Sequence, residues 1–144
     1  MKLVFVDKEV YSYKKQPDKT YVALVGSSKA KKDLYPEVKE KFLNYLSENN
    51  IDINNIVLVS GGAKGVDKFA EKLAEELDID IVVIRPDYDE HYFKQAPLER
   101  NKRIAGLADI VVAFPKFGSS SGTLNTLKHA RSFGKKTKVF YLKF

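Results

Sequence analysis

Five short apolar runs, separated by segments with helical periodicity, constrain the fold of this chain most strongly. The runs span residues 21–25, 56–59, 81–84, 110–114 and 139–142, and nearly every position in them is apolar. Strands with one face in water alternate apolar and polar residues, so uninterrupted runs indicate parallel strands covered by helices on both faces. The sequence therefore predicts an α/β fold with a doubly wound, mainly parallel five-stranded sheet.

The segments between the runs carry apolar residues at spacings of three and four, most clearly in residues 34–46 and 66–77. This period is typical of amphipathic helices, and Pro36 and Pro97 suit the first turns of two of them. Because 144 residues is the length of one domain, we expect a single domain over 1–144. Within it, residues 1–19 are expected to add an edge strand or hairpin to a core formed by residues 20–144.

Several classes of protein are excluded or disfavoured by composition. The chain has no Cys and two His, so thiolate metal sites are excluded and a histidine-rich metal site is disfavoured. No apolar run approaches the roughly 20 residues that a membrane-spanning helix needs. The apolar stretch at the N-terminus is too short for a signal peptide, so we expect a cytoplasmic protein without metal.

Charge is distributed unevenly along the chain. The net charge is +6, yet residues 111–144 contain seven basic residues and no acid, while residues 33–84 carry more acids than bases. Basic surfaces favour anionic partners such as nucleotides or nucleic acid. Solvated surface lysines explain the same excess, so charge alone leaves the partner open.

The loops after the predicted strands are the candidate ligand site. In doubly wound sheets, ligands bind beyond the carboxyl ends of the strands, near the point where strand order reverses. If the five strands take the common order 3-2-1-4-5, the loops after the first and fourth strands face each other there. Three of the four loops are rich in Gly and Ser, at residues 26–28, 60–65 and 118–123.

Small residues in these loops suit an anion. Glycine lets backbone N–H groups approach a phosphate closely, and a helix N-terminus adds unpaired N–H groups and a positive dipole end. Residues 118–123 lead directly into the last helix, so they are the leading phosphate cradle. The predicted loop ligands are Gly26, Ser27, Ser28, Gly61, Gly62, Gly118, Ser119, Ser120, Ser121, Gly122 and Thr123.

Standard nucleotide signatures do not occur in this sequence. Residues 61–65 read GGAKG, which is not the G-x-G-x-x-G of dinucleotide sites, and no acid ends the second strand to bind a ribose. The P-loop pattern G-x-x-x-x-G-K-[ST] is also missing. Nicotinamide or flavin redox chemistry is therefore disfavoured, a P-loop NTPase is excluded, and we expect no cofactor.

Three segments together resemble the SLOG superfamily, which unites DprA/Smf with the Lonely Guy phosphoribohydrolases. They read VSGGAKGVD at residues 59–67, ERNKRIAGLAD at 99–109 and GSSSGTL at 118–124. Their order and spacing agree with the superfamily, and the similarity covers roughly residues 20–142. It implies a Rossmann-like fold that binds nucleotides, nucleotide-derived ligands or nucleic-acid phosphates, and it implies a homo-oligomer because members often pair through helices.

The resemblance also implies roles for single residues. Arg100 would reach a phosphate or sugar from the helix before the fourth strand, and Asn101 would tie loops together. Asp67 falls in the first turn of its helix, where the dipole favours a carboxylate, and its expected role is a cap or loop anchor. Lonely Guy proteins place a Glu in the pattern P-G-G-x-G-T-x-x-E, whereas this chain has Thr126 there.

Three functions remain open at this level. The first is a sensor or binding module for a nucleotide-like phosphate, and the second is DprA-like binding of single-stranded nucleic acid. The third is hydrolysis of a nucleotide N-glycosidic bond, which Thr126 disfavours because a hydroxyl cannot replace a carboxylate base or nucleophile.

Overall fold

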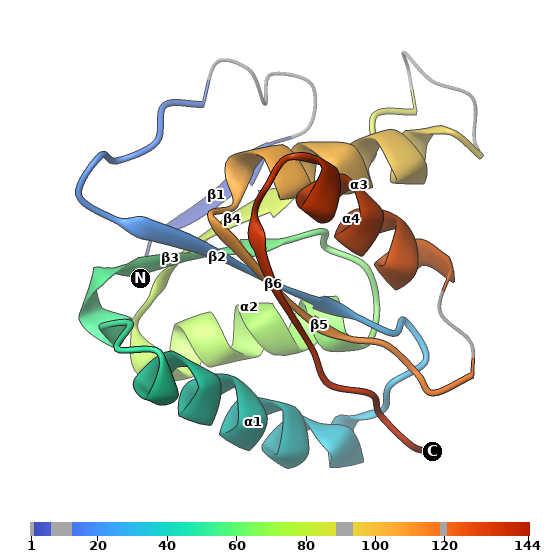
Figure 1. The fold of residues 1–144 in the computed structure, drawn as a ribbon, viewed down its shortest axis with the longest axis horizontal. Coiled ribbons are helices and arrows are strands. Elements are labelled where there is room, and N and C mark those ends of the chain that lie inside the picture. Colours follow the sequence, from blue (N-terminus) through green and yellow to red (C-terminus); the bar gives the residue numbers. More distant parts are fainter. Residues whose placement is uncertain (1, 7–12, 89–93, 119–120) are drawn as a thin grey trace.

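The computed structural model describes residues 2–6, 13–88, 94–118 and 121–144, and it is an α/β structure built on a parallel sheet (Figure 1). The six strands are β1 (Leu3–Val6), β2 (Thr20–Gly26), β3 (Ile56–Ser60), β4 (Asp80–Ile84), β5 (Ile110–Phe114) and β6 (Lys136–Val139). The helices that cover the sheet are α1 (Tyr35–Glu48), α2 (Val66–Leu77), α3 (Ala96–Leu107) and α4 (Ser121–Ser132). The predicted doubly wound, Rossmann-like class is therefore confirmed.

Strand order places the point of reversal at β2. The sheet runs β1-β4-β3-β2-β5-β6, and every described pairing is parallel. Without β1 this is the predicted order, with β2 between β3 and β5. The loops after β2 and β5 consequently leave the sheet side by side and turn to opposite faces, which is the arrangement that opens a crevice in such folds.

The predicted N-terminal addition is a strand. β1 pairs in parallel with β4, with Leu3 opposite Ile81 and Val6 opposite Ile84, so the five-stranded core gains a sixth strand at its edge. Val6 is buried, whereas Leu3 and Phe5 are exposed. An edge position accounts for this partial burial.

The last strand lies earlier than the apolar pattern predicts. The structure has β6 at Lys136–Val139 rather than at residues 139–142. Edge strands can remain polar, and the lysines of β6 stay in solvent. The apolar residues at 139–142 instead contribute contacts to the core beyond the strand. Leu142 is fully buried, and the ring of Phe140 stacks on that of Phe114 with 5.1 Å between the ring centres.

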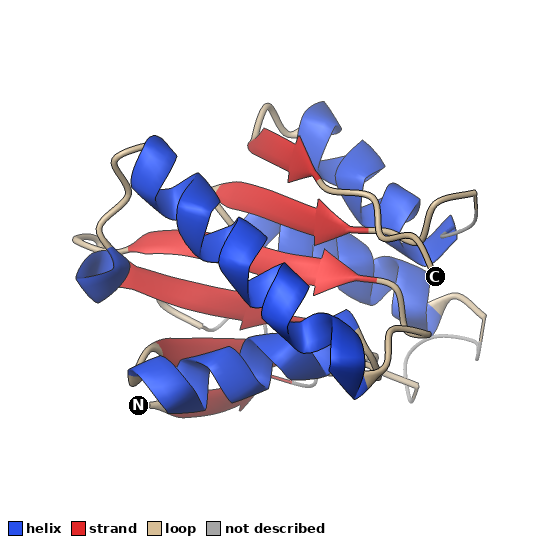
Figure 2. Ribbon diagram, turned by 90° about the horizontal axis from the view of Figure 1, so that it is seen from below, coloured by secondary structure: helices blue, strands red, loops and turns tan. Residues whose placement is uncertain are grey.

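Two clusters of buried residues explain the continuous apolar runs. α1 and α2 pack on one face of the sheet through residues such as Phe42 and Leu73, while α3 and α4 pack on the other through Ile104 and Leu127 (Figures 1 and 2). The four inner strands, β2 to β5, therefore bury both of their faces. Within the described residues, no helix has the length and apolar character needed to cross a bilayer.

Candidate functional site

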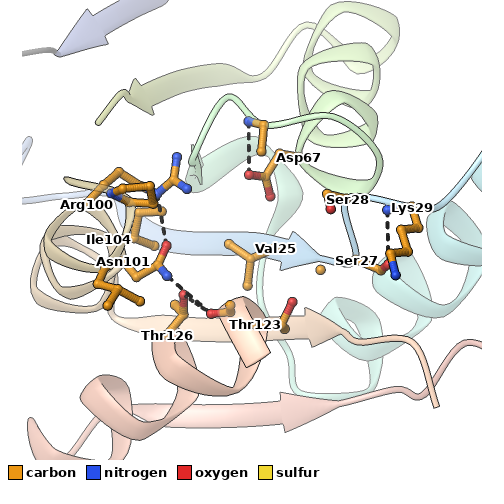
Figure 3. Close-up of a pocket in the computed structure, with 15 residues that line it drawn as sticks. Val25, Ser27, Ser28, Lys29, Asp67, Arg100, Asn101, Ile104, Thr123 and Thr126 are labelled. Atoms are coloured by element: carbon orange, nitrogen blue, oxygen red, sulfur yellow. Dashed lines mark hydrogen bonds between the residues drawn. The ribbon is translucent and has the colours of Figure 1, made fainter. Parts of the chain in front are cut away.

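A cavity of about 510 Å³ opens at the carboxyl edge of the sheet, where β2 lies between β3 and β5 (Figure 3). We call it the switch-point cavity. Its walls are the end of β2 and the loop after it, the start of α2, the first three turns of α3 and the first two turns of α4. Segments that are far apart in the sequence thus converge on one space at the place where the topology predicts a ligand site.

The loop after β2 is held rigidly between β5 and α2. The Ser27 N–H donates to the Phe114 carbonyl at 3.0 Å, and the Ser27 carbonyl accepts from the Val66 N–H at 3.1 Å. A Cβ on Gly26 would lie 2.4 Å from the Phe114 carbonyl oxygen, so only glycine fits this approach. The loop is therefore already shaped in the free protein, which lowers the entropic cost of binding a ligand.

Asp67 brings a buried carboxyl group to the cavity from the first turn of α2. Its Oδ2 accepts a hydrogen bond from the Ala63 N–H at 3.2 Å, and its side chain is almost fully buried. Burial raises the pKa of Asp67 from 3.8 to about 6, because desolvation outweighs the opposing effects of Arg100 and the Ala63 amide. The predicted anchoring contact exists, and the same carboxyl also faces the cavity.

Arg100 reaches the cavity from α3. Its Nη1 donates to the Gly61 carbonyl, and its Nε donates to the Asn101 Oδ1 at 2.9 Å. Burial lowers the pKa of Arg100, Asp67 raises it, and the guanidinium remains charged at physiological pH. A Cβ on Gly61 would lie 2.8 Å from the Asp67 Oδ2 and 3.0 Å from the Arg100 Nη1, so glycine permits the two charged groups to flank the β3 end.

Asn101 connects α3 to the start of α4. Its Nδ2 donates to the Gly122 carbonyl at 3.2 Å and to the Asn125 Oδ1 at 3.3 Å. Thr126 donates to the same Gly122 carbonyl at 3.4 Å. These bonds tie the first turn of α4 to α3, and that turn lines the cavity with Gly122 and Thr123, whose N–H groups belong to the positive end of the helix.

The structure brings together six of the predicted ligand residues. Those that line the switch-point cavity are Gly26, Ser27, Ser28, Arg100, Gly122 and Thr123. Ser121 begins α4. Ser119 and Ser120 lie outside the described residues.

Three predicted glycines lie elsewhere. Gly61 and Gly62 do not belong to the described lining, which receives Ala63 and Asp67 from that segment instead. The Gly62 N–H donates to the buried Ser60 Oγ at 3.2 Å. Gly118, with φ of +82°, follows β5 and is also absent from the described lining.

Sequence reasoning missed part of the cavity lining. Lys29 directly follows the predicted loop, so its position could have been expected from the chain alone. Pro97, Leu98 and Ile104 form an apolar side of the cavity, and no local pattern distinguishes them from ordinary helix residues. Thr126 also lines the space, from the second turn of α4.

Two further observations bear on the site. Across the described parts of the chain, no three His, Asp or Glu side chains come close enough together to hold a metal ion. Comparisons of this chain with protein-family models, with curated proteins and with solved structures gave no match.

Proposed function

We propose that the protein binds a nucleotide or a nucleotide-derived phosphate in the switch-point cavity and acts as a sensor or binding module. The observation that carries this proposal is the convergence of the α4 N-terminus, Arg100 and a rigid β2 loop on one cavity. Its volume of about 510 Å³ falls in the range of small-molecule sites, roughly 300–1,000 Å³. The resemblance of the sequence to the SLOG superfamily supports the same function.

The cavity offers different chemistry for the two parts of such a ligand. The first turn of α4 supplies N–H donors and a positive dipole end for a phosphate, and Lys29 and Arg100 add positive charge. Leu98 and Ile104 contribute apolar surface against which a base or sugar ring packs. A mostly apolar wall with a few converging polar groups is typical of small-molecule sites.

Calorimetry with the four ribonucleoside 5′-monophosphates tests the proposal. At least one is expected to bind and to raise the free energy of unfolding, by about 2.7 kcal/mol at a ligand concentration of 100 Kd. Lys29→Gln is expected to weaken binding several-fold. Lys31→Gln removes the same charge two residues along, outside the cavity lining, and is expected to change little. If none of the four nucleotides binds or stabilises the protein, the proposed function is wrong.

A second candidate function, binding of single-stranded nucleic acid, is favoured by a cluster near the C-terminus. The side chains of Phe117 and Tyr141 are 63% and 51% exposed. Their rings meet edge to face, with 5.9 Å between the ring centres. Lys143 Nζ lies 5.8 Å from the centre of the Phe117 ring, and Lys116 Nζ lies 4.8 Å from that of Phe144. Exposed rings beside lysines provide stacking surfaces for bases and charge for the backbone.

Fluorescence anisotropy with a labelled oligothymidylate tests this second candidate. Binding is expected at low salt, with affinity that falls steeply as salt is added, because phosphate contacts release counterions. Phe117→Ala combined with Tyr141→Ala is expected to weaken binding about tenfold or more. Phe133→Ala removes another exposed ring, at the end of α4, and serves as the control. Affinity that is indifferent to salt, or equal loss in the control, argues against the candidate.

N-glycosidic hydrolysis is not proposed. The α4 position that carries the carboxylate in Lonely Guy proteins is Thr126, whose hydroxyl donates to the Gly122 carbonyl. A hydroxyl in this contact provides no carboxylate base or nucleophile.

A further inference from the structure

The switch-point cavity has two chemically opposite sides. Asp67 enters it from α2, on one face of the sheet, and Thr123 enters it from the first turn of α4, on the other face. Figure 3 shows these two residues on either side of Val25, near the end of β2. One side therefore presents a hydrogen-bond acceptor, and the other presents the positive end of a helix.

Asp67 keeps acceptor capacity for a ligand. Its Oδ2 accepts from the Ala63 N–H, and an ionised carboxylate has room for several such bonds. Two of the N–H donors of the neighbouring Arg100 go to the Gly61 carbonyl and to Asn101, and its positive charge favours the ionised form of Asp67. A neutral hydroxyl group of a bound molecule is the donor that suits this side of the cavity.

We propose that Asp67 determines specificity in the switch-point cavity by accepting hydrogen bonds from the sugar hydroxyls of the ligand, whose phosphate binds at the first turn of α4. This inference rests on the proposed function and orients the ligand within it. A phosphate cannot occupy the Asp67 side without bringing two anions together in a buried space. The cavity thus selects ribose phosphates over phosphates that lack vicinal hydroxyls.

The charged groups around Asp67 make this selection depend on pH. Arg100 from α3 and Lys68 from α2 favour the carboxylate, whereas Glu71 from α2 and burial oppose it. Burial prevails, and the pKa of Asp67 is raised to about 6. The group is ionised at pH 7.5 and neutral at pH 5, and a neutral carboxyl accepts hydrogen bonds more weakly than a carboxylate.

The wild-type protein provides the first test. Calorimetry compares each ribonucleoside 5′-monophosphate with its 2′,3′-dideoxy counterpart at pH 7.5 and at pH 5. At pH 7.5 the ribonucleotide is expected to bind about tenfold more tightly or better, and at pH 5 the ratio falls to about threefold. The ligand phosphate also titrates in this range, but it does so equally in both compounds, so the ratio reports on Asp67.

Matched variants provide the second test. In Asp67→Asn the side-chain oxygen can still accept from the Ala63 N–H, while the negative charge is lost. This variant is expected to bind the two nucleotide forms within about threefold of each other at both pH values. Glu71→Gln removes a negative charge one turn along α2, outside the described lining, and is expected to keep the wild-type ratio at pH 7.5, where Asp67 is ionised in both proteins.

Each outcome separates the inference from the proposed function. If ribonucleotides and dideoxynucleotides bind equally well to the wild type at pH 7.5, the cavity binds nucleotides but Asp67 does not select sugars. Discrimination that survives in Asp67→Asn also overturns the inference. If no nucleotide binds, the proposed function fails and the inference fails with it. Should Asp67→Asn not fold, the ratio of ribonucleotide to dideoxynucleotide affinity in the wild type, and its dependence on pH, decide whether the inference holds.

Discussion

Gly122→Glu is expected to weaken the proposed nucleotide binding by about 100-fold or more, because it places a negative charge at the proposed phosphate site. Gly122 lines the switch-point cavity in the first turn of α4, and a Cβ at this residue meets no heavy atom within 4 Å. The Cβ of the new side chain is therefore accommodated without a clash. The substitution is even expected to stabilise the fold by about 1 kcal/mol, because Glu forms helices better than Gly and suits a helix N-terminus.

Gly122→Gln isolates the charge from the bulk of the new side chain. It has nearly the same size and is expected to retain binding within about tenfold of the wild type. The measurement is calorimetry with the nucleotide that binds the wild type, together with urea denaturation of each variant. Equal loss of affinity in the two variants would show that bulk rather than charge is responsible, and unchanged affinity in Gly122→Glu would place the ligand elsewhere.

Gly65→Ala is expected to lower the free energy of unfolding by about 3–5 kcal/mol, the largest stability effect among these substitutions. Gly65 precedes α2 with φ of +74° and ψ of −129°, a conformation that L side chains rarely adopt. Its added Cβ would lie 2.2 Å from the Ser27 carbonyl oxygen. That carbonyl accepts from the Val66 N–H, so the substitution forces the β2 loop away from α2.

Gly134→Ala is the matched control for this effect. Gly134 has a similar φ of +71°, but a Cβ there meets no heavy atom within 4 Å. Only the backbone strain applies, so the expected loss is about 1 kcal/mol. Chemical denaturation of both variants gives the comparison. If Gly65→Ala lowers the free energy of unfolding no more than Gly134→Ala does, the contact between the β2 loop and α2 does not hold the cavity together.

The elements of the fold could be predicted from the sequence because their signals are local. Residues 56–59 and 110–114 form strands with little change in bounds, since parallel strands buried on both faces need continuous apolar residues. The exception is β6, where the apolar run at 139–142 marks core contacts of Phe140 and Leu142 rather than a strand. At the edge of the sheet, residues can pair in a strand while they stay exposed, and residues outside the strand can be the ones that pack into the core.

The candidate site could be predicted only in part. Gly26 and Gly122 lie at the cavity as expected from the topology of the loops. Gly61 follows the same pattern, yet its missing Cβ makes room for Asp67 and Arg100. A glycine in a sequence indicates that something approaches the backbone closely, but it does not indicate which atom approaches.

The sequence by itself determined the class of fold, the order of its elements and the edge of the sheet at which the cavity opens, because apolar periodicity and turn residues act over a few neighbouring positions. The tertiary structure alone decided that Asp67 is buried beside Arg100 and that Leu98 and Ile104 face the cavity. Burial and charge proximity depend on the packing of segments distant in the chain. The acceptor side of the cavity therefore appears only once α2, α3 and the end of β3 are assembled.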